Sequence, residues 1–117
     1  ENLPDTLIEF QIQNRDKDDI IINIPESIGR FKKLDMILLD NCVASLPNSI
    51  GELKLLRFLA LPNNKKLTDL PESIKDLPNL FFLNVKGCPN VKVPQSILDR
   101  SEDMCGGCGM YDIDPLN

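Results

Sequence analysis

One short motif recurs along the chain at a nearly constant interval, and this periodicity constrains the fold more than any other feature of the sequence. The motif is Pro-x-Ser-Ile, always preceded by an apolar residue, and its successive prolines are 22, 24 and 23 residues apart. Fixed periods of about 20–50 residues are typical of stacked units, because one unit cannot bury its apolar face alone. The copies of the motif begin at Pro25, Pro47, Pro71 and Pro94.

A second apolar pattern lies between the prolines and has the same period. Its form is apolar-x-x-apolar-x-apolar, as in the run from Leu34 to Leu39. Alternation with a period of two predicts a short strand with one face toward the interior. The proline motif predicts a short 3₁₀ or helical return on the opposite side, where the missing N–H does no harm. The expected units are residues 7–33, 34–55, 56–79 and 80–102.

These units account for nearly the whole chain, so we expect a single domain over residues 1–117, with a C-terminal cap or tail at 98–117. The first unit carries a polar insertion at 14–19, which predicts a protruding loop. The serines of the proline motif are expected at helix starts and not as nucleophiles. Because the chain opens at Glu1, we expect it to be an excerpt of a longer protein.

The combined pattern, LxxLxLxxN/CxLxxLPxxIxxL, resembles the leucine-rich repeat (LRR) of the intracellular LPxxIxxL type. Its Asn/Cys position is held by Cys42, Asn64 and Cys88, whose side chains are expected to satisfy backbone groups inside the coil. The stretch 77–91 is most similar to the repeats of plant disease-resistance (NB-LRR) receptors, and Ras-group scaffold proteins share the LPxxIxxL form. The resemblance implies an α/β solenoid. This would be a short right-handed arc with a parallel β-sheet on the concave face and 3₁₀ or short helices on the convex side.

The strand positions that alternate with the inward leucines are expected to face outward on the concave side. These positions are polar in the first strand and mainly apolar in the next three. A contiguous apolar strip on a protein surface usually marks an interaction site, and charged residues at its margin would orient a partner. The predicted partner-binding residues are Met36, Leu38, Asp40, Phe58, Ala60, Phe82, Asn84 and Lys86. Alternatively, the strip is covered by the chain's own tail, by further repeats or by a second copy.

Composition excludes several classes of function. The chain has no histidine, which removes Ser-His-Asp and Cys-His catalysis and the commonest metal ligand. Its formal net charge of −5 disfavours nucleic acid and anionic membrane surfaces as partners. Its apolar runs are too short to span a bilayer. We therefore expect no enzyme activity, no catalytic residues and no cofactor.

The remaining cysteines and acidic residues point to no additional site. Cys105 and Cys108 form a lone CxxC, which supplies only half of a zinc site, so we expect no metal. Unpaired thiols are the leading interpretation and a labile disulfide is the alternative. The chain has no cysteine before Cys42 and no N-glycosylation acceptor, which favours a cytoplasmic setting, with a nuclear one as an alternative. The acidic residues expected at a solvated terminus are Asp99, Glu102, Asp103, Asp112 and Asp114.

The sequence thus predicts a non-catalytic protein–protein interaction module that binds a protein partner on its concave face. The resemblance implies either an immune-receptor-like sensor or a signalling scaffold. Two other classes remain as alternatives. In one, the chain is a fixed structural subunit of a larger assembly. In the other, it is the repeat arm of an enzyme whose catalytic part lies outside these residues.

Overall fold

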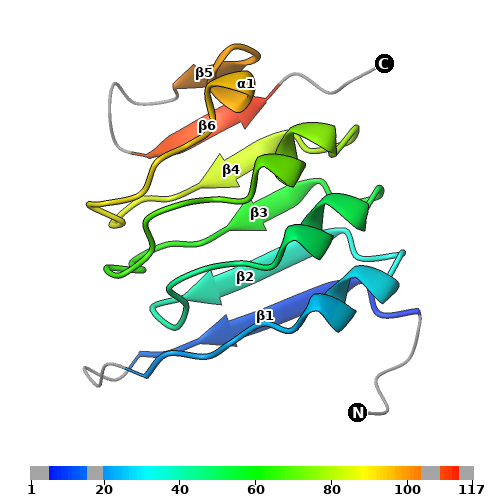
Figure 1. The fold of residues 1–117 in the computed structure, drawn as a ribbon, viewed down its shortest axis with the longest axis horizontal. Coiled ribbons are helices and arrows are strands. Elements are labelled where there is room, and N and C mark those ends of the chain that lie inside the picture. Colours follow the sequence, from blue (N-terminus) through cyan, green and yellow to red (C-terminus); the bar gives the residue numbers. More distant parts are fainter. Residues whose placement is uncertain (1–5, 16–19, 104–108, 114–117) are drawn as a thin grey trace.

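The computed structural model describes residues 6–15, 20–103 and 109–113, which form an α/β domain (Figure 1). Most of the insertion expected to protrude at 14–19 lies outside these residues, as do Cys105, Cys108 and Asp114. The elements in chain order are β1 (Glu9–Gln13), η1 (Glu26–Arg30), β2 (Met36–Asp40), η2 (Asn48–Glu52), β3 (Phe58–Ala60), η3 (Glu72–Asp76), β4 (Phe82–Asn84), α1 (Gln95–Leu98), β5 (Ser101–Asp103) and β6 (Met110–Ile113), where η marks a 3₁₀ helix.

The strands of the described part form one six-stranded mixed sheet in the order β1-β2-β3-β4-β6-β5. The first four strands are parallel, and a 3₁₀ segment lies between each of them and the next (Figure 1). Such a crossover is what a parallel pair requires. The register places Met36 opposite Phe58, and Phe58 opposite Phe82. Equivalent positions of successive predicted units therefore lie side by side.

The expectation of an entirely parallel sheet is wrong at the C-terminal end. β6 pairs antiparallel with β4, and β5 pairs antiparallel with β6. The region 98–117 was expected to run from a helical stretch into a tail, but α1 ends at Leu98 and the chain returns as a strand pair. The physical reason is that the edge of β4 would otherwise leave backbone groups unpaired. β6 pairs with that edge, and Ile113 is buried in the core.

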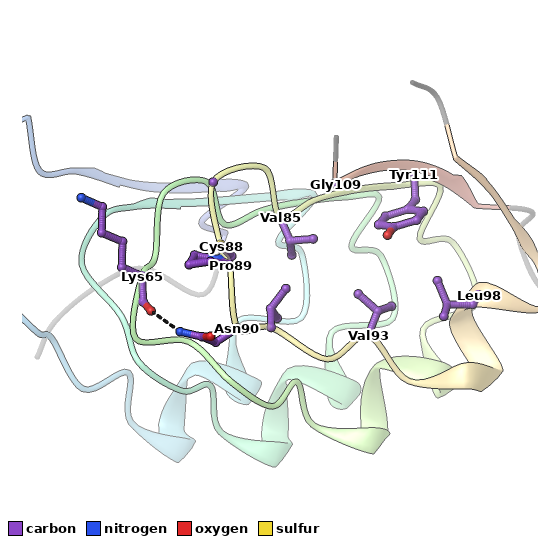
Figure 2. A pocket seen from close by; sticks show the side chains of 11 residues that line it. Lys65, Val85, Cys88, Pro89, Asn90, Val93, Leu98, Gly109 and Tyr111 are labelled. Carbon is purple, nitrogen blue, oxygen red and sulfur yellow. Dashed lines mark hydrogen bonds between the residues drawn. The ribbon is translucent and has the colours of Figure 1, made fainter. Parts of the chain in front are cut away.

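The core lies between the sheet and the helical segments, which Figure 2 shows on opposite sides of the domain. The inward positions predicted from the period-two pattern are confirmed in the second, third and fourth units, where these side chains are almost completely buried. Leu7, Phe10 and Ile12 of the first unit, at the edge of the sheet, are only half-buried and pack against this core. Each unit adds apolar side chains that contact those of the next, which forms one continuous core. The buried residues of the period-two pattern, in the strands and directly beside them, include Leu34, Ile37, Leu39, Leu56, Leu59, Leu61, Leu80, Leu83 and Val85.

The serines of the proline motif lie in the first turn of the helical segments, as expected, but they do not occupy the cap position. The cap residues of η1, η2 and η3 are the motif's prolines, and no side-chain capping bond is made at them. The backbone N–H of Ser49 donates to the Glu26 carboxylate of the preceding unit at 3.1 Å. The Ser73 hydroxyl donates to the Asn48 carbonyl at 2.6 Å. Ser49 and Ser73 instead pack against the preceding unit. A methyl group added at Gly29 would lie 2.8 Å from the Cβ of Ser49, and one added at Gly51 would lie 2.5 Å from the Cβ of Ser73.

The small residues therefore allow neighbouring 3₁₀ segments to approach closely. Lys75 stands in η3 where Gly29 and Gly51 stand in the two preceding segments. Correspondingly, α1 packs much less closely on η3 than η3 packs on η2. The change from glycine to lysine coincides with the end of close stacking, just before the antiparallel cap begins.

The turn after the strands is organised by buried side chains, as predicted for Asn64 and Cys88. The Oδ1 of Asn64 accepts hydrogen bonds from the backbone N–H groups of Cys42 (2.8 Å) and Val43 (2.9 Å), and its Nδ2 donates to the carbonyl of Leu39 (2.8 Å). The Cys88 thiol donates to a backbone carbonyl at 2.9 Å. Cys42 and Cys88 are both free, and burial raises the pKa of each thiol.

Candidate functional site

The face of the sheet that points away from the core, called the outer face below, carries a row of large apolar side chains. Met36, Phe58 and Phe82 lie directly opposite one another on β2, β3 and β4. All three are half-buried, whereas their inward neighbours along each strand are buried. The structure thus brings three of the predicted partner-binding residues into one line across the strands.

A second, less apolar row runs beside the first on the outer face. It consists of Leu38, Ala60 and Asn84, again in register across β2, β3 and β4. Leu38 and Asn84 are half-buried, whereas Ala60 is only 9% exposed and contributes a shallow floor. The outer face therefore has one prominent row of large apolar side chains, and a second row beside it in which the small Ala60 protrudes less.

The two predicted charged residues lie at the carboxyl ends of the parallel strands. Asp40 is the last residue of β2 and accepts a hydrogen bond from the Nδ2 of Asn63 at 3.1 Å. Lys86 follows β4 and is exposed, and its backbone N–H donates to the Oδ1 of Asn84 at 2.9 Å. Both residues therefore lie two positions beyond the second row and four positions beyond the row of Met36, Phe58 and Phe82.

One aromatic residue of this surface was missed by the sequence analysis. Phe81 immediately precedes β4, and its ring lies 4.7 Å from that of Phe58 in an edge-to-face arrangement. Phe82 lies 6.3 Å from Phe58 with similar geometry. The repeat gives no signal for Phe81, because the equivalent positions in the two preceding units are the charged residues Asp35 and Arg57.

Arg57 links this aromatic cluster to the neighbouring unit. Its guanidinium lies 5.4 Å from the ring centre of Phe58 and 5.9 Å from that of Phe81, within the range of cation–π contact. It also donates two hydrogen bonds to Asp35, of which Nη2 to Oδ2 is 3.0 Å long. This pairing lowers the pKa of Asp35 and raises that of Arg57.

Acidic side chains lie at both ends of the apolar row. Glu9 on β1 is opposite Met36, Asp112 on β6 is opposite Phe82, and Glu102 on β5 is opposite Asp112. All three acids are exposed. From the sequence, Glu102 and Asp112 are expected at a solvated terminus, because the repeat gives no sign of the antiparallel pairing that brings them to this face. The complete row is Glu9, Met36, Phe58, Phe82, Asp112 and Glu102.

A pocket of about 910 Å³ is lined by residues of the fourth unit and of the C-terminal cap (Figure 2). In Figure 2, the side chains of Val93, Leu98 and Tyr111 point into the same space, from the segment before α1, from α1 and from β6. Beside them, the amide of Asn90 donates to the Lys65 carbonyl at 3.4 Å. Among the described residues the lining is mainly apolar, with Lys65 as its charged member.

The described residues contain no group of three or more histidine, cysteine or acidic side chains placed to hold a metal ion. In the same part of the chain, no helix is long and apolar enough to cross a membrane. What the outer face offers is an aromatic and aliphatic row with charge at its ends. Surfaces with an apolar centre and a charged margin are typical of protein docking.

Comparison with protein-family models gives no match, and a search of curated proteins gives none either.

Proposed function

We propose that this chain is a non-catalytic leucine-rich-repeat module that binds a protein partner through the outer face of its sheet. In this proposal the parallel strands form the concave side of a short right-handed arc, and the 3₁₀ segments form its convex side. The observation that carries the proposal is the row of Met36, Phe58 and Phe82, which lie in register and half-exposed on three neighbouring strands.

Two features of the repeating part support the solenoid. The helical segments η1, η2 and η3 follow the parallel strands at equivalent positions and pack on one another. The side chains of Asn64 and Cys88 each bond backbone groups of the preceding unit. Both contacts join one unit to its neighbour and recur with the period of the sequence, as expected when stability comes from nearest-neighbour contacts.

The composition of the outer face supports binding over a purely structural role. Methionine and phenylalanine are enriched at protein interfaces, and a few buried aromatic residues usually carry most of the binding energy. Phe58 and Phe82 are held in place by aromatic and cation–π contacts before any partner arrives, which lowers the entropic cost of binding. A sensor or a signalling scaffold in the cytoplasm or nucleus is the role this proposal assigns.

The test is selection of binders against the whole immobilised chain from a phage-displayed library of randomised helix-forming peptides. Enriched peptides are then measured by fluorescence anisotropy against the variants Phe58→Ala and Phe82→Ala. The matched control is Leu55→Ala, because Leu55 is 51% exposed and lies in the connection between η2 and β3. Loss of an interface aromatic of this kind costs about 2 kcal/mol or more of binding free energy.

Thermal unfolding of the same variants separates binding from folding. Removal of a half-buried phenylalanine should cost about 1–2 kcal/mol of stability, compared with about 3–5 kcal/mol for one in a packed core. The proposal fails if the library yields no binder, or if the enriched peptides bind the Phe58 and Phe82 variants as tightly as they bind the unsubstituted chain.

A further inference from the structure

We infer that the partner segment at the outer face is an amphipathic α-helix that crosses the strands and carries cationic residues at both ends of its apolar stripe. This inference rests on the proposed function and specifies the chemistry of its partner. It is carried by the acids at the two ends of the Met36–Phe58–Phe82 row and by the direction in which that row runs.

The terminal acids of the row lack cationic partners within the described part of the chain. Glu9, Asp112 and Glu102 are exposed, and the ion pairs of that part involve other residues. Glu102 and Asp112 lie directly opposite each other on neighbouring strands. Two like charges in this position destabilise a strand pair. A cation supplied by the partner would relieve that repulsion.

The cations near the outer face do not compensate these acids. Arg57 is already bonded to Asp35 through two hydrogen bonds. Lys86 follows the end of β4, beyond Asn84, and therefore lies outside the row. The row itself carries three acidic residues and no basic one. Rim charges of one sign favour a partner of the opposite sign and accelerate its encounter.

The strand pairing and the spacing of the strands along the row favour a helical partner over an extended peptide. Backbone groups within the sheet are engaged in its own strand pairing, so its face offers no main-chain hydrogen bonds to an added strand. A helix satisfies its own backbone and needs only side-chain contacts. Neighbouring strands lie about 4.8 Å apart, close to the helical pitch of about 5.4 Å, so each strand can receive one apolar residue per turn.

The spacing of the acids sets the length of the helix. Glu9 and Asp112 are separated by four strand intervals, or about 19 Å. A helix rises about 1.5 Å per residue, so its two cationic ends should be about 13 residues apart. Glu102, one strand further, gives the second end an additional carboxylate to contact.

The experiment uses the peptides enriched from the phage library. The inference predicts Lys or Arg at both ends of their apolar stripe and binding that weakens as salt is added. In the triple variant Glu9→Gln, Glu102→Gln and Asp112→Asn, affinity should fall about 1.5- to 5-fold for each acid removed, mainly through a slower association rate. A proline placed at the centre of an enriched peptide should abolish binding, because it breaks the helix.

The matched control is the triple variant Asp69→Asn, Glu72→Gln and Asp76→Asn, which removes the same charge from exposed positions in and near η3. It should leave the affinity within about 1.5-fold, as expected for charges away from the interface. Thermal unfolding verifies that both triple variants fold.

The possible outcomes separate this inference from the proposed function. Enriched peptides that are neutral or acidic at their ends, that tolerate the central proline, or that lose equal affinity in both triple variants would overturn the inference. If such peptides still depend on Phe58 and Phe82, the proposed function stands. A library that yields no binder, or only binders indifferent to both phenylalanines, overturns both.

Discussion

Replacement of the buried Asn64 by leucine tests whether side-chain bonds at the strand turn hold neighbouring units together. The amide is 1% exposed, and its hydrogen bonds satisfy the N–H groups of Cys42 and Val43 and the carbonyl of Leu39. Leucine has a similar volume, so the substitution removes the bonds and leaves little cavity. Each buried group left without a partner costs about 1–3 kcal/mol, so for these three groups we expect a loss of about 3–9 kcal/mol of unfolding free energy.

The assay is urea unfolding followed by circular dichroism, because the chain has no tryptophan. The control is Asn90→Leu, since Asn90 is exposed and makes one long hydrogen bond of 3.4 Å; it should change stability by less than about 0.5 kcal/mol. Asn64→Cys should be milder than Asn64→Leu, because cysteine occupies the equivalent position at Cys88 and bonds the backbone there. A loss below about 1 kcal/mol for Asn64→Leu would refute the reasoning.

Other features of the fold give predictions of the same kind. Gly51→Ala should destabilise the chain by about 1–3 kcal/mol in urea unfolding, because of overpacking. Ser73→Gly in the same chain should restore only part of the loss, since the added methyl would lie 2.5 Å from the Cβ of Ser73 but also 2.7 Å from its backbone carbonyl oxygen. The lowered pKa of Asp35 means that its ion pair stabilises the fold above pH 3.8 and that this contribution is lost as pH falls through the lowered value. Asp35→Asn should therefore show a smaller loss of stability over that acidic range, and an unchanged acid profile would contradict this. The raised pKa values of the buried Cys42 and Cys88 thiols predict slow alkylation by iodoacetamide in the folded chain and rapid alkylation in urea, read by mass spectrometry. Equal rates in both states would show that these thiols are not buried.

The repeating part of the fold could be predicted because the same alternation of apolar residues recurs in each unit. Alternation within a strand assigns Leu59 to the core and Phe58 to the outer face, and the next unit repeats the assignment with Leu83 and Phe82. Parallel neighbours in register then place equivalent residues side by side. The apolar row therefore follows from the period alone.

The C-terminal cap could not be predicted in the same way, because it has no counterpart in the repeat. The pairing of β6 with β4 is antiparallel and depends on the open sheet edge, which no local pattern encodes. Glu102 and Asp112 looked like charges of a solvated tail until this pairing placed them at the end of the apolar row.

The motif serines show how local preference can mislead. Serine is a common helix-capping residue, but the Cβ atoms of Ser49 and Ser73 pack against a glycine of the preceding unit. The contact is made between units, so the spacing within one unit does not reveal it. Phe81 was missed for a related reason, since its importance comes from a ring contact with Phe58 of the preceding unit.

The most direct test of the central claim is an NMR titration of the folded chain, labelled at methyl and aromatic carbons, with a peptide enriched from the library. We predict that the signals of Met36, Leu38, Phe58 and Phe82 shift on binding, whereas those of the exposed methyl groups of Leu55 do not. Shifts confined to Leu55 and the 3₁₀ segments, with Met36, Phe58 and Phe82 unchanged, would contradict binding at the outer face of the sheet.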